Sequence, residues 1–196
     1  MARMTREESQ ALTRTKLVSV ARTLFTRDGY AATSLDRIAE EAGFSKGAVY
    51  SNFDGKESLF LEVLDEHGKQ SLAAILAALA GAGTIDEAID AIAHWAEKSS
   101  RKGNWPSLIL DYSRNAKPAA TFRKSQEKVL RAQWGALGER LLALAGNTDL
   151  AAETVGALVF ELTYAPAMSF VSKPTSGDLL RVALHGVFRA PVDTRR

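Results

Sequence analysis

The chain has 196 residues, with 25 Lys and Arg against 23 Asp and Glu, a formal net charge of +2 and no cysteine. This length allows one helical domain of ordinary size and a smaller one, and the lack of cysteine excludes disulfides and thiol chemistry. No run reaches the roughly 18 apolar residues of a membrane span, and MARMTREESQ lacks the apolar core of a signal peptide. We therefore expect a cytoplasmic protein without a membrane partner.

The charge is unevenly distributed although its sum is small. Up to Arg27, six basic residues stand against Glu7 and Glu8, whereas acidic residues outnumber basic ones between Asp28 and Gln70. A basic arm ahead of the first helix could touch a nucleic-acid backbone or minor groove. A solvated, frayed terminus would have the same composition, so both interpretations stay open.

The first predicted helix runs roughly from Glu7 to Arg27. Gly29 is suited to end it, because glycine tolerates the backbone conformation of a helix C-terminus. The apolar residues of this helix fall at i, i+4, i+7 and i+8 and form one stripe: Leu17, Ala21, Leu24 and Phe25. Such a stripe predicts that the helix packs against the elements that follow.

Residues 33–60 are typical of two short helices joined by a tight turn. Thr33 or Ser34 can cap the first of them. Gly43 can end it, since glycine adopts the left-handed conformation without steric cost, and Ser45 can cap the second. The first helix has one apolar face, made by Leu35, Ile38, Ala39 and Ala42.

The second short helix has the side-chain distribution of a helix that reads DNA. Phe44, Val49 and Phe53 can anchor its inner side. The residues that can face outward are mostly small or polar, which permits close approach to a major groove: Ser45, Lys46, Gly47, Ala48 and Tyr50. An ordinary helical hairpin would show the same periodicity, so spacing alone does not decide between the two interpretations.

Residues from Asp54 to about Leu79 are predicted to form one long helix. We place a domain boundary inside it, near Gly68 to Ser71, which gives domains 1–70 and 71–196. Beyond Gly83 no alternating run indicates a strand, so the expected fold class is all-α. The further helices are predicted at roughly 85–101, 106–115, 118–145, 149–171 and 177–189.

One region resembles the N-terminal domain of the TetR family of transcriptional regulators: TKLVSVARTLFTRDGYAATSLDRIAEEAGFSKGAVYSNFDGKESLFLEVL. The agreement covers about fifty residues and includes G-Y, A-x-T-S-x-x-x-I-A-x-x-A-G-F-S-x-G-x-V-Y and F-x-x-K-E-x-L. One departure is Asn52, where the family usually carries Tyr or His. The resemblance implies a three-helix helix-turn-helix domain with a reading unit at about 34–53, followed by a helical domain for effector binding and dimerisation.

The resemblance also implies which residues contact DNA. Thr33 and Ser34 would donate to phosphate at the start of their helix, and Lys56 would hold a phosphate against the first turn of the long helix. Tyr50 would meet bases or phosphates, although it could also be a half-buried spacer. The predicted DNA-binding residues are Thr33, Ser34, Ser45, Lys46, Gly47, Tyr50, Asn52 and Lys56.

Aromatic residues concentrate in the second half of the chain. Any one of them is most simply part of the core, but together they suggest an apolar cleft whose Trp and Tyr donors orient a ligand. The predicted wall consists of Trp95, Trp105, Leu108, Tyr112, Trp134, Phe160 and Tyr164. His94, Asp111 and Glu161 are candidate polar contacts, each also interpretable as a surface or capping residue. We expect a small apolar or aromatic effector.

Other chemistry finds little support in the sequence. Asp90 and His94 have metal-ligand spacing but lack a third or fourth partner, so we predict no metal site. There is no nucleophile-elbow motif, no histidine in a recognisable catalytic setting and no nucleotide-binding glycine loop. We therefore predict that the chain is not an enzyme and needs no cofactor.

Dimerisation would complete a DNA reader, because one helix covers only a few base pairs and a palindrome requires two. We expect a homodimer through 149–171 and 177–189, where Gly156 and Gly186 would permit close approach, although this face could instead pack within the subunit. The function expected is transcriptional regulation, most simply by a repressor that a ligand releases from its palindromic operator. The alternatives are an activator, or a ligand-binding protein of this fold without specific DNA binding.

Overall fold

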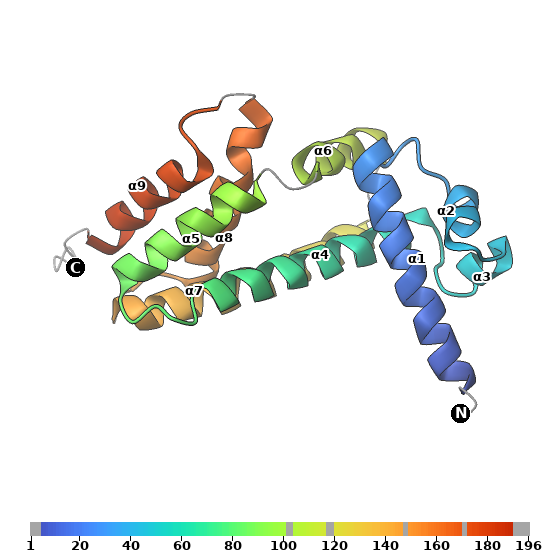
Figure 1. The fold of residues 1–196 in the computed structure, drawn as a ribbon, viewed down its shortest axis with the longest axis horizontal. Helices are drawn as coiled ribbons and strands as arrows, with labels where there is room; N and C mark the ends of the chain where they lie inside the picture. The colour runs from blue at the N-terminus through green and yellow to red at the C-terminus, as the bar shows by residue number, and fades with distance from the viewer. Residues whose placement is uncertain (1–4, 101–103, 117–119, 147–148, 170–171, 190–196) are drawn as a thin grey trace. The chain divides into compact units, whose positions relative to one another are not determined.

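The computed structural model describes residues 5–100, 104–116, 120–146, 149–169 and 172–189. Throughout these ranges the regular structure is helical, which confirms the all-α fold class (Figure 1). The helices are α1 (Arg6–Asp28), α2 (Leu35–Ala42), α3 (Lys46–Tyr50), α4 (Lys56–Ala78), α5 (Ile85–Ser99), α6 (Trp105–Asn115), α7 (Ala120–Ala145), α8 (Ala152–Ser169) and α9 (Ser176–Arg189). None of the helices in the described ranges has both the length and the apolar character that a membrane span requires.

The helices begin and end close to the predicted positions, with one difference that affects the DNA-binding region. The long helix was predicted to start at Asp54, whereas α4 starts at Lys56. Its first turn is closed by the N–H of Leu59, which donates to the carbonyl of Gly55 at 3.2 Å. Residues 101, 118–119 and 170–171, which belonged to predicted helix ends, lie outside the described residues.

The chain divides into two compact units. The first contains the residues up to His67 together with Asn104–Glu127, and the second contains Gly68–Gly103 and the residues from Lys128 onward. Helix α4 therefore passes from the first unit to the second between His67 and Gly68. Residues 104–127 belong to the first unit, although their position in the sequence placed them in the predicted second domain.

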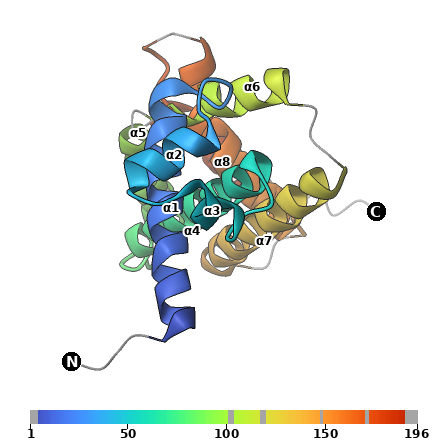
Figure 2. The same cartoon turned by 90° about the vertical axis from the view of Figure 1, so that its right-hand side faces the viewer.

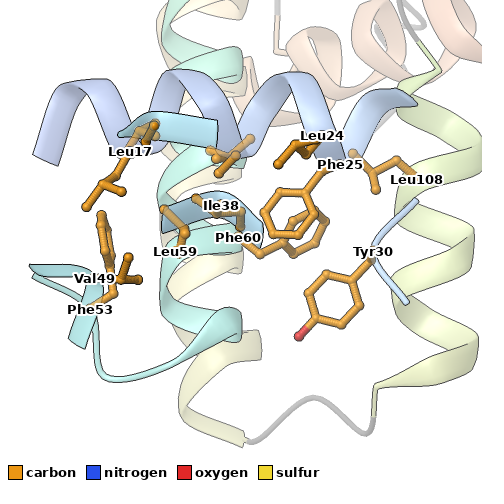
Figure 3. Close-up of a cluster of buried hydrophobic side chains, with 14 of the residues drawn as sticks. Leu17, Leu24, Phe25, Tyr30, Ile38, Val49, Phe53, Leu59, Phe60 and Leu108 are labelled. Atoms are coloured by element: carbon orange, nitrogen blue, oxygen red, sulfur yellow. The ribbon is translucent and has the colours of Figure 1, made fainter. Parts of the chain in front are cut away.

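A buried cluster holds the first unit together (Figure 3). The four N-terminal helices contribute its completely buried side chains, among them Leu17, Leu24, Phe25, Ile38, Val49, Leu59 and Phe60. Burial of one such side chain stabilises a fold by about 1.5–3 kcal/mol, so this cluster fixes α2 and α3 against α1 and α4.

Helix α6 completes the first unit through aromatic contacts. Trp105, Leu108 and Tyr112 are each at most 4% exposed and belong to the same buried cluster. The ring of Tyr112 lies 4.9 Å from the ring of Tyr30 and 4.8 Å from that of Phe60. These contacts explain why α6 packs with the N-terminal helices.

The second unit has its own buried core, which includes Ile75, Leu79, Ile89, Ile92, Leu137, Leu141, Val159, Leu180 and Leu184. Two glycines let α7 and α8 pack closely. A Cβ at Gly138 would lie 1.8 Å from the carbonyl oxygen of Ala152, and one at Gly156 would lie 1.9 Å from that of Trp134. Gly156 thus serves packing inside the subunit, contrary to the expected role between subunits, whereas Gly186 has no atom within 4 Å of such a Cβ.

Candidate nucleic-acid interface

The turn between α2 and α3 depends on a few local hydrogen bonds. Gly43 has φ 74°, a left-handed conformation that is strained for residues with a Cβ. The hydroxyl of Ser45 accepts the N–H of Ala48 at 3.2 Å and so begins α3. Ser34 begins α2 in the same way by accepting the N–H of Arg37 at 3.2 Å. These residues set the direction of the two helices.

The inner side of α3 is anchored in the core of the first unit. Val49 is fully buried and Phe53 is 3% exposed. Phe44, in the turn before α3, packs against the same cluster, and the ammonium of Lys16 lies 5.5 Å from its ring centroid. The three anchors expected from the sequence therefore hold α3 in one orientation.

The outer side of α3 consists of exposed residues. Helix α3 follows α2 in the chain (Figure 2). Ser45, Lys46 and Gly47 are exposed, and Tyr50 retains 60% of its accessible surface. A Cβ at Gly47 would have only the Ser45 hydroxyl nearby, at 3.8 Å. The packing of the protein therefore does not require glycine at this position.

Lys46 is linked to α2 by an ion pair that sequence reasoning missed. Its ammonium donates to the carboxylate of Asp36, and both side chains are more than half exposed. The hydrogen bond to Asp36, reinforced by the carboxylate charge, raises the pKa of Lys46 above its ordinary value. Asp36 and Lys46 are ten residues apart and lie on different helices, so helical periodicity could not predict this contact.

Lys56, the first residue of α4, reaches back to the loop that precedes α2. Its ammonium donates to the carbonyl of Ala31 at 3.3 Å and lies 4.2 Å from the ring centroid of Tyr30. Partial burial lowers the pKa of Lys56. The ammonium is thereby held near the beginning of α2, where Ser34 is exposed.

Two of the predicted DNA-binding residues are turned inward. Thr33 is 1% exposed, and its hydroxyl donates to the carbonyl of Gly29 at 2.8 Å. Asn52 is half-buried, and its side-chain amide donates to the carbonyl of Ala48 at 2.7 Å. In this structure both side chains stabilise the local fold through these hydrogen bonds.

Arg14 links α1 to α4 and to the segment that follows α3. Its Nε donates to Glu62 of α4 at 2.8 Å, and its guanidinium also donates to the backbone carbonyl of Asn52. The same guanidinium lies 4.3 Å from the ring centroid of Phe53. The pairing of Arg14 with Glu62 could not be predicted from the sequence, because the two residues are 48 positions apart.

Other basic residues near the N-terminus also have partners within the first unit. Arg27 pairs with Asp28 at 2.9 Å and with Glu41 at 3.5 Å, which connects α1 to α2. The guanidinium of Arg22 lies 5.7 Å from the ring centroid of Trp105. Helix α1 begins at Arg6, so this residue of the expected arm lies on the helix, whereas Arg3 lies outside the described residues.

Helix α6 contacts both the loop before α2 and the start of α4. The carboxylate of Asp111 accepts the N–H of Ala31 at 3.0 Å. The hydroxyl of Tyr112 donates to Glu57 at 2.5 Å, and burial together with this carboxylate raises the pKa of Tyr112. The positions of Ala31 and Glu57 therefore depend partly on α6.

His67 forms a further contact with α6, at the end of the α4 segment that belongs to the first unit. Its ring stacks on the ring of Trp105 with centroids 3.7 Å apart and planes 9° apart. Burial, with a smaller effect of the Arg22 charge, lowers the pKa of His67 to about 4. The imidazole is therefore uncharged at neutral pH.

The predicted wall of the ligand cleft is divided between the two units. Trp105, Leu108 and Tyr112 lie in the core of the first unit. The other members belong to the hydrophobic cluster of the second unit: Trp95, Trp134, Phe160 and Tyr164. Neither unit brings all seven together, because α6 packs with the N-terminal helices.

Two residues of the predicted ligand wall that lie in the second unit have polar groups in apolar surroundings. Burial raises the pKa of the Tyr164 hydroxyl, which also forms a hydrogen bond with Ser71. The indole Nε1 of Trp134 is buried and finds no acceptor within the described part of the chain.

The three residues predicted as polar contacts of the ligand cleft do not lie together in one of the two cores. Asp111 accepts the N–H of Ala31 in the first unit, and His94 and Glu161 are exposed. Asp90, which has metal-ligand spacing to His94, instead pairs with Arg181 of α9 at 3.0 Å. In the described ranges no three His, Asp or Glu side chains are grouped as metal ligands would be.

The region that contains α2 and α3 matches a known protein family. Residues 17–63 match the family described as bacterial regulatory proteins, tetR family. The HTH-type transcriptional regulator AcrR of Shigella flexneri is 44% identical over 63 residues, which are 32% of this chain and 29% of that protein. The HTH-type transcriptional repressor KstR2 of Rhodococcus jostii is 45% identical over 51 residues, or 26% of this chain and 25% of that repressor. The matched segments thus cover less than a third of these relatives.

The fold of the chain is similar to that of solved regulators. A transcriptional regulator from Streptomyces coelicolor A3(2) superposes with a TM-score of 0.70 at 22% identity, over 90% of this chain and 98% of that one. The regulator FadR from Bacillus subtilis, solved in complex with stearoyl-CoA, gives a TM-score of 0.64 at 15% identity, over 89% and 97% of the two chains. At these identities the likeness concerns the fold alone.

Proposed function

Because the N-terminal domain belongs to the TetR family of bacterial regulatory proteins, we propose that the chain is a sequence-specific DNA-binding regulator of transcription, most simply a repressor. The observation that supports this best is the outer face of α3. Its inner side is locked by Val49 and Phe53, while Lys46, Gly47 and Tyr50 are exposed. Such a helix fits the major groove of DNA, and the absence of a packing reason for Gly47 favours a requirement imposed from outside.

The exposed polar residues have distinct roles in this proposal. Lys46 and Tyr50 contact bases or phosphates in the major groove. The hydroxyls of Ser34 and Ser45 donate to phosphates, and Lys56 supplies a positive charge beside α2. Thr33 and Asn52 support the fold of the reading unit from inside, as their hydrogen bonds with Gly29 and Ala48 indicate.

We propose that residues 1–70 act as the DNA-binding domain and residues 71–196 as the effector-binding and dimerisation domain, with α6 packed on the first. Two copies joined through α8 and α9 would present two copies of α3 to the half-sites of a palindrome. Val182 on α9 is 77% exposed and supports this interface, because a large apolar side chain gains from burial.

The proposed effector is a small apolar or aromatic molecule acting on a cytoplasmic protein. The aromatic side chains of the second unit support an apolar ligand, and the buried Nε1 of Trp134 offers a donor. FadR from Bacillus subtilis was solved with stearoyl-CoA, a ligand with a long apolar chain. Binding would release DNA if the ligand prefers an arrangement in which the two reading helices no longer match the groove spacing.

Substitution of the exposed residues of α3 tests the DNA-binding function. Lys46→Ala and Tyr50→Ala should each lower the affinity for a selected DNA duplex roughly tenfold while leaving the fold and oligomeric state unchanged. Ile109→Ala, at an exposed apolar position of α6, is the matched control and should bind like wild type. Wild-type affinity of both α3 variants would show that α3 is not the reading helix.

The second candidate function is ligand binding without specific DNA recognition. The inward orientation of Asn52, where the family usually carries Tyr or His, is the observation in its favour. A protein of that kind would bind DNA weakly and with no preference for sequence.

A further inference from the structure

Asp36 lies beside the outer face of α3, although it belongs to α2. Its carboxylate accepts the ammonium of Lys46, and the pair connects the first turn of α2 to the first residue of α3. The Lys46 side chain is 67% exposed and the Asp36 side chain 52%. The pair is therefore accessible to a molecule that approaches α3.

Local electrostatics favours this pair in the DNA-free protein. A cation at the start of α3 faces the positive end of the helix dipole, whereas a carboxylate in the first turn of α2 is well placed. Asp36 offsets the unfavourable position of Lys46, which explains why the ammonium leans toward α2. An exposed ion pair of this kind is weak and can exchange partners.

The same pair has a consequence for DNA binding. A phosphate attracts the Lys46 ammonium and repels the Asp36 carboxylate. While the two side chains remain paired, their charges cancel, and Lys46 displaces no counterion from DNA. Contact between Lys46 and DNA therefore requires exchange of the Asp36 carboxylate for a DNA group.

We propose that Asp36 is an intramolecular counterion that DNA must displace from Lys46, and that it thereby sets the affinity of the reading helix. This proposal rests on the DNA-binding function proposed above. Asp36 is a positioning residue here, since it acts through Lys46.

A double-mutant cycle tests the proposal. Wild type, Asp36→Asn, Lys46→Gln and the double variant are titrated with a selected duplex and a random-sequence duplex of equal length, over a series of salt concentrations. Asp36→Asn should bind up to about fivefold more tightly per reading helix. Its log affinity should fall more steeply with log salt, by about 0.9 per reading helix. In the Lys46→Gln background, Asp36→Asn should change neither quantity.

Glu40→Gln provides the matched control, because it removes one exposed negative charge from the same helix. Glu40→Gln should change the DNA affinity equally in the wild-type and in the Lys46→Gln background. Thermal unfolding of each variant checks that α2 still forms.

Three outcomes would overturn the proposal. If Asp36→Asn had the same effect in both backgrounds, the carboxylate would act as a general charge and not through Lys46. If wild type bound DNA but Asp36→Asn bound no more tightly, the proposal would fail while the proposed function stood. If wild type bound neither duplex, both would fail.

Discussion

Gly43 and Gly47 lie four positions apart and meet different physical needs. Gly43 has φ 74°, so the turn between α2 and α3 requires a residue without a Cβ. Gly47 lies within α3, and a Cβ there would meet only the Ser45 hydroxyl at 3.8 Å. The first glycine serves the fold, and we assign the second to the approach of DNA.

Gly47→Ala should separate stability from function. The free energy of unfolding should stay the same or rise by about 0.5–1 kcal/mol, because alanine loses less backbone entropy in a helix. DNA affinity should fall roughly tenfold, since the added methyl group meets the groove wall. Denaturant unfolding and DNA titration measure the two effects. Gly81→Ala, at another open position, should leave DNA affinity unchanged, and undiminished affinity of Gly47→Ala would contradict the assignment.

Local signals predicted individual residues well where the cause was local. Gly43 and Ser45 were identified as caps from residue type alone, and the structure has them as caps. Thr33 and Ser34 were both candidates for the cap of α2, and the structure has Ser34. The ion pairs of Arg14 with Glu62 and of Lys46 with Asp36 were not predicted, since each joins different helices. Thr33 and Ser34 are equally good caps by residue type, so residue type could not predict which of them is buried. Packing buries Thr33.

At the scale of elements, α6 contacts both connections that flank the two short helices. It accepts the N–H of Ala31 through Asp111 and donates to Glu57 through Tyr112. Ala31 lies in the loop before α2, and Glu57 is in the first turn of α4. Helix α6 thus stabilises the loop before α2 and the first turn of α4.

Tyr112→Phe should lower the free energy of unfolding by about 1–3 kcal/mol, because the partly buried carboxylate of Glu57 loses its donor. Denaturant unfolding measures the change. Tyr50→Phe removes a hydroxyl from an exposed ring and is the matched control, for which no change is expected. Equal stability of Tyr112→Phe and wild type would mean that the hydrogen bond to Glu57 does not contribute to the fold.

Element boundaries could be predicted, but the partners of the elements could not. Helix ends follow Ser, Gly and Pro, which act within a few residues of the chain. The partner of α6 depends on the ring contacts of Tyr112 with Tyr30 and Phe60, and no periodicity shows which core an amphipathic helix joins. For this reason the predicted ligand wall combined residues that the structure places in separate cores.

At the scale of the whole molecule, the proposed function needs two chains. A five-residue reading helix reaches only a few base pairs, so specificity requires a second copy at a fixed spacing. Helix α9 presents Val182, and Gly186 one turn later leaves room beside it. Both features suit a close helix contact across a two-fold axis.

Val182→Arg should convert the proposed dimer to a monomer, because it would bury an unpaired charge in the proposed interface. Sedimentation analysis of the purified variant measures the mass directly. Ile109→Arg places the same charge at an exposed apolar position of α6 and should leave the dimer intact. A dimeric Val182→Arg protein would move the interface away from this face of α9.

Selection of duplexes from a random pool by the purified protein, at one fixed salt concentration, tests the central claim most directly. Constant salt is essential because phosphate contacts make affinity steeply dependent on it. We predict that wild type enriches a palindrome whose half-sites lie about one helical turn apart, and that Lys46→Ala with Tyr50→Ala loses this enrichment. Recovery of no preferred sequence by the folded wild-type protein would contradict the claim that α3 reads DNA.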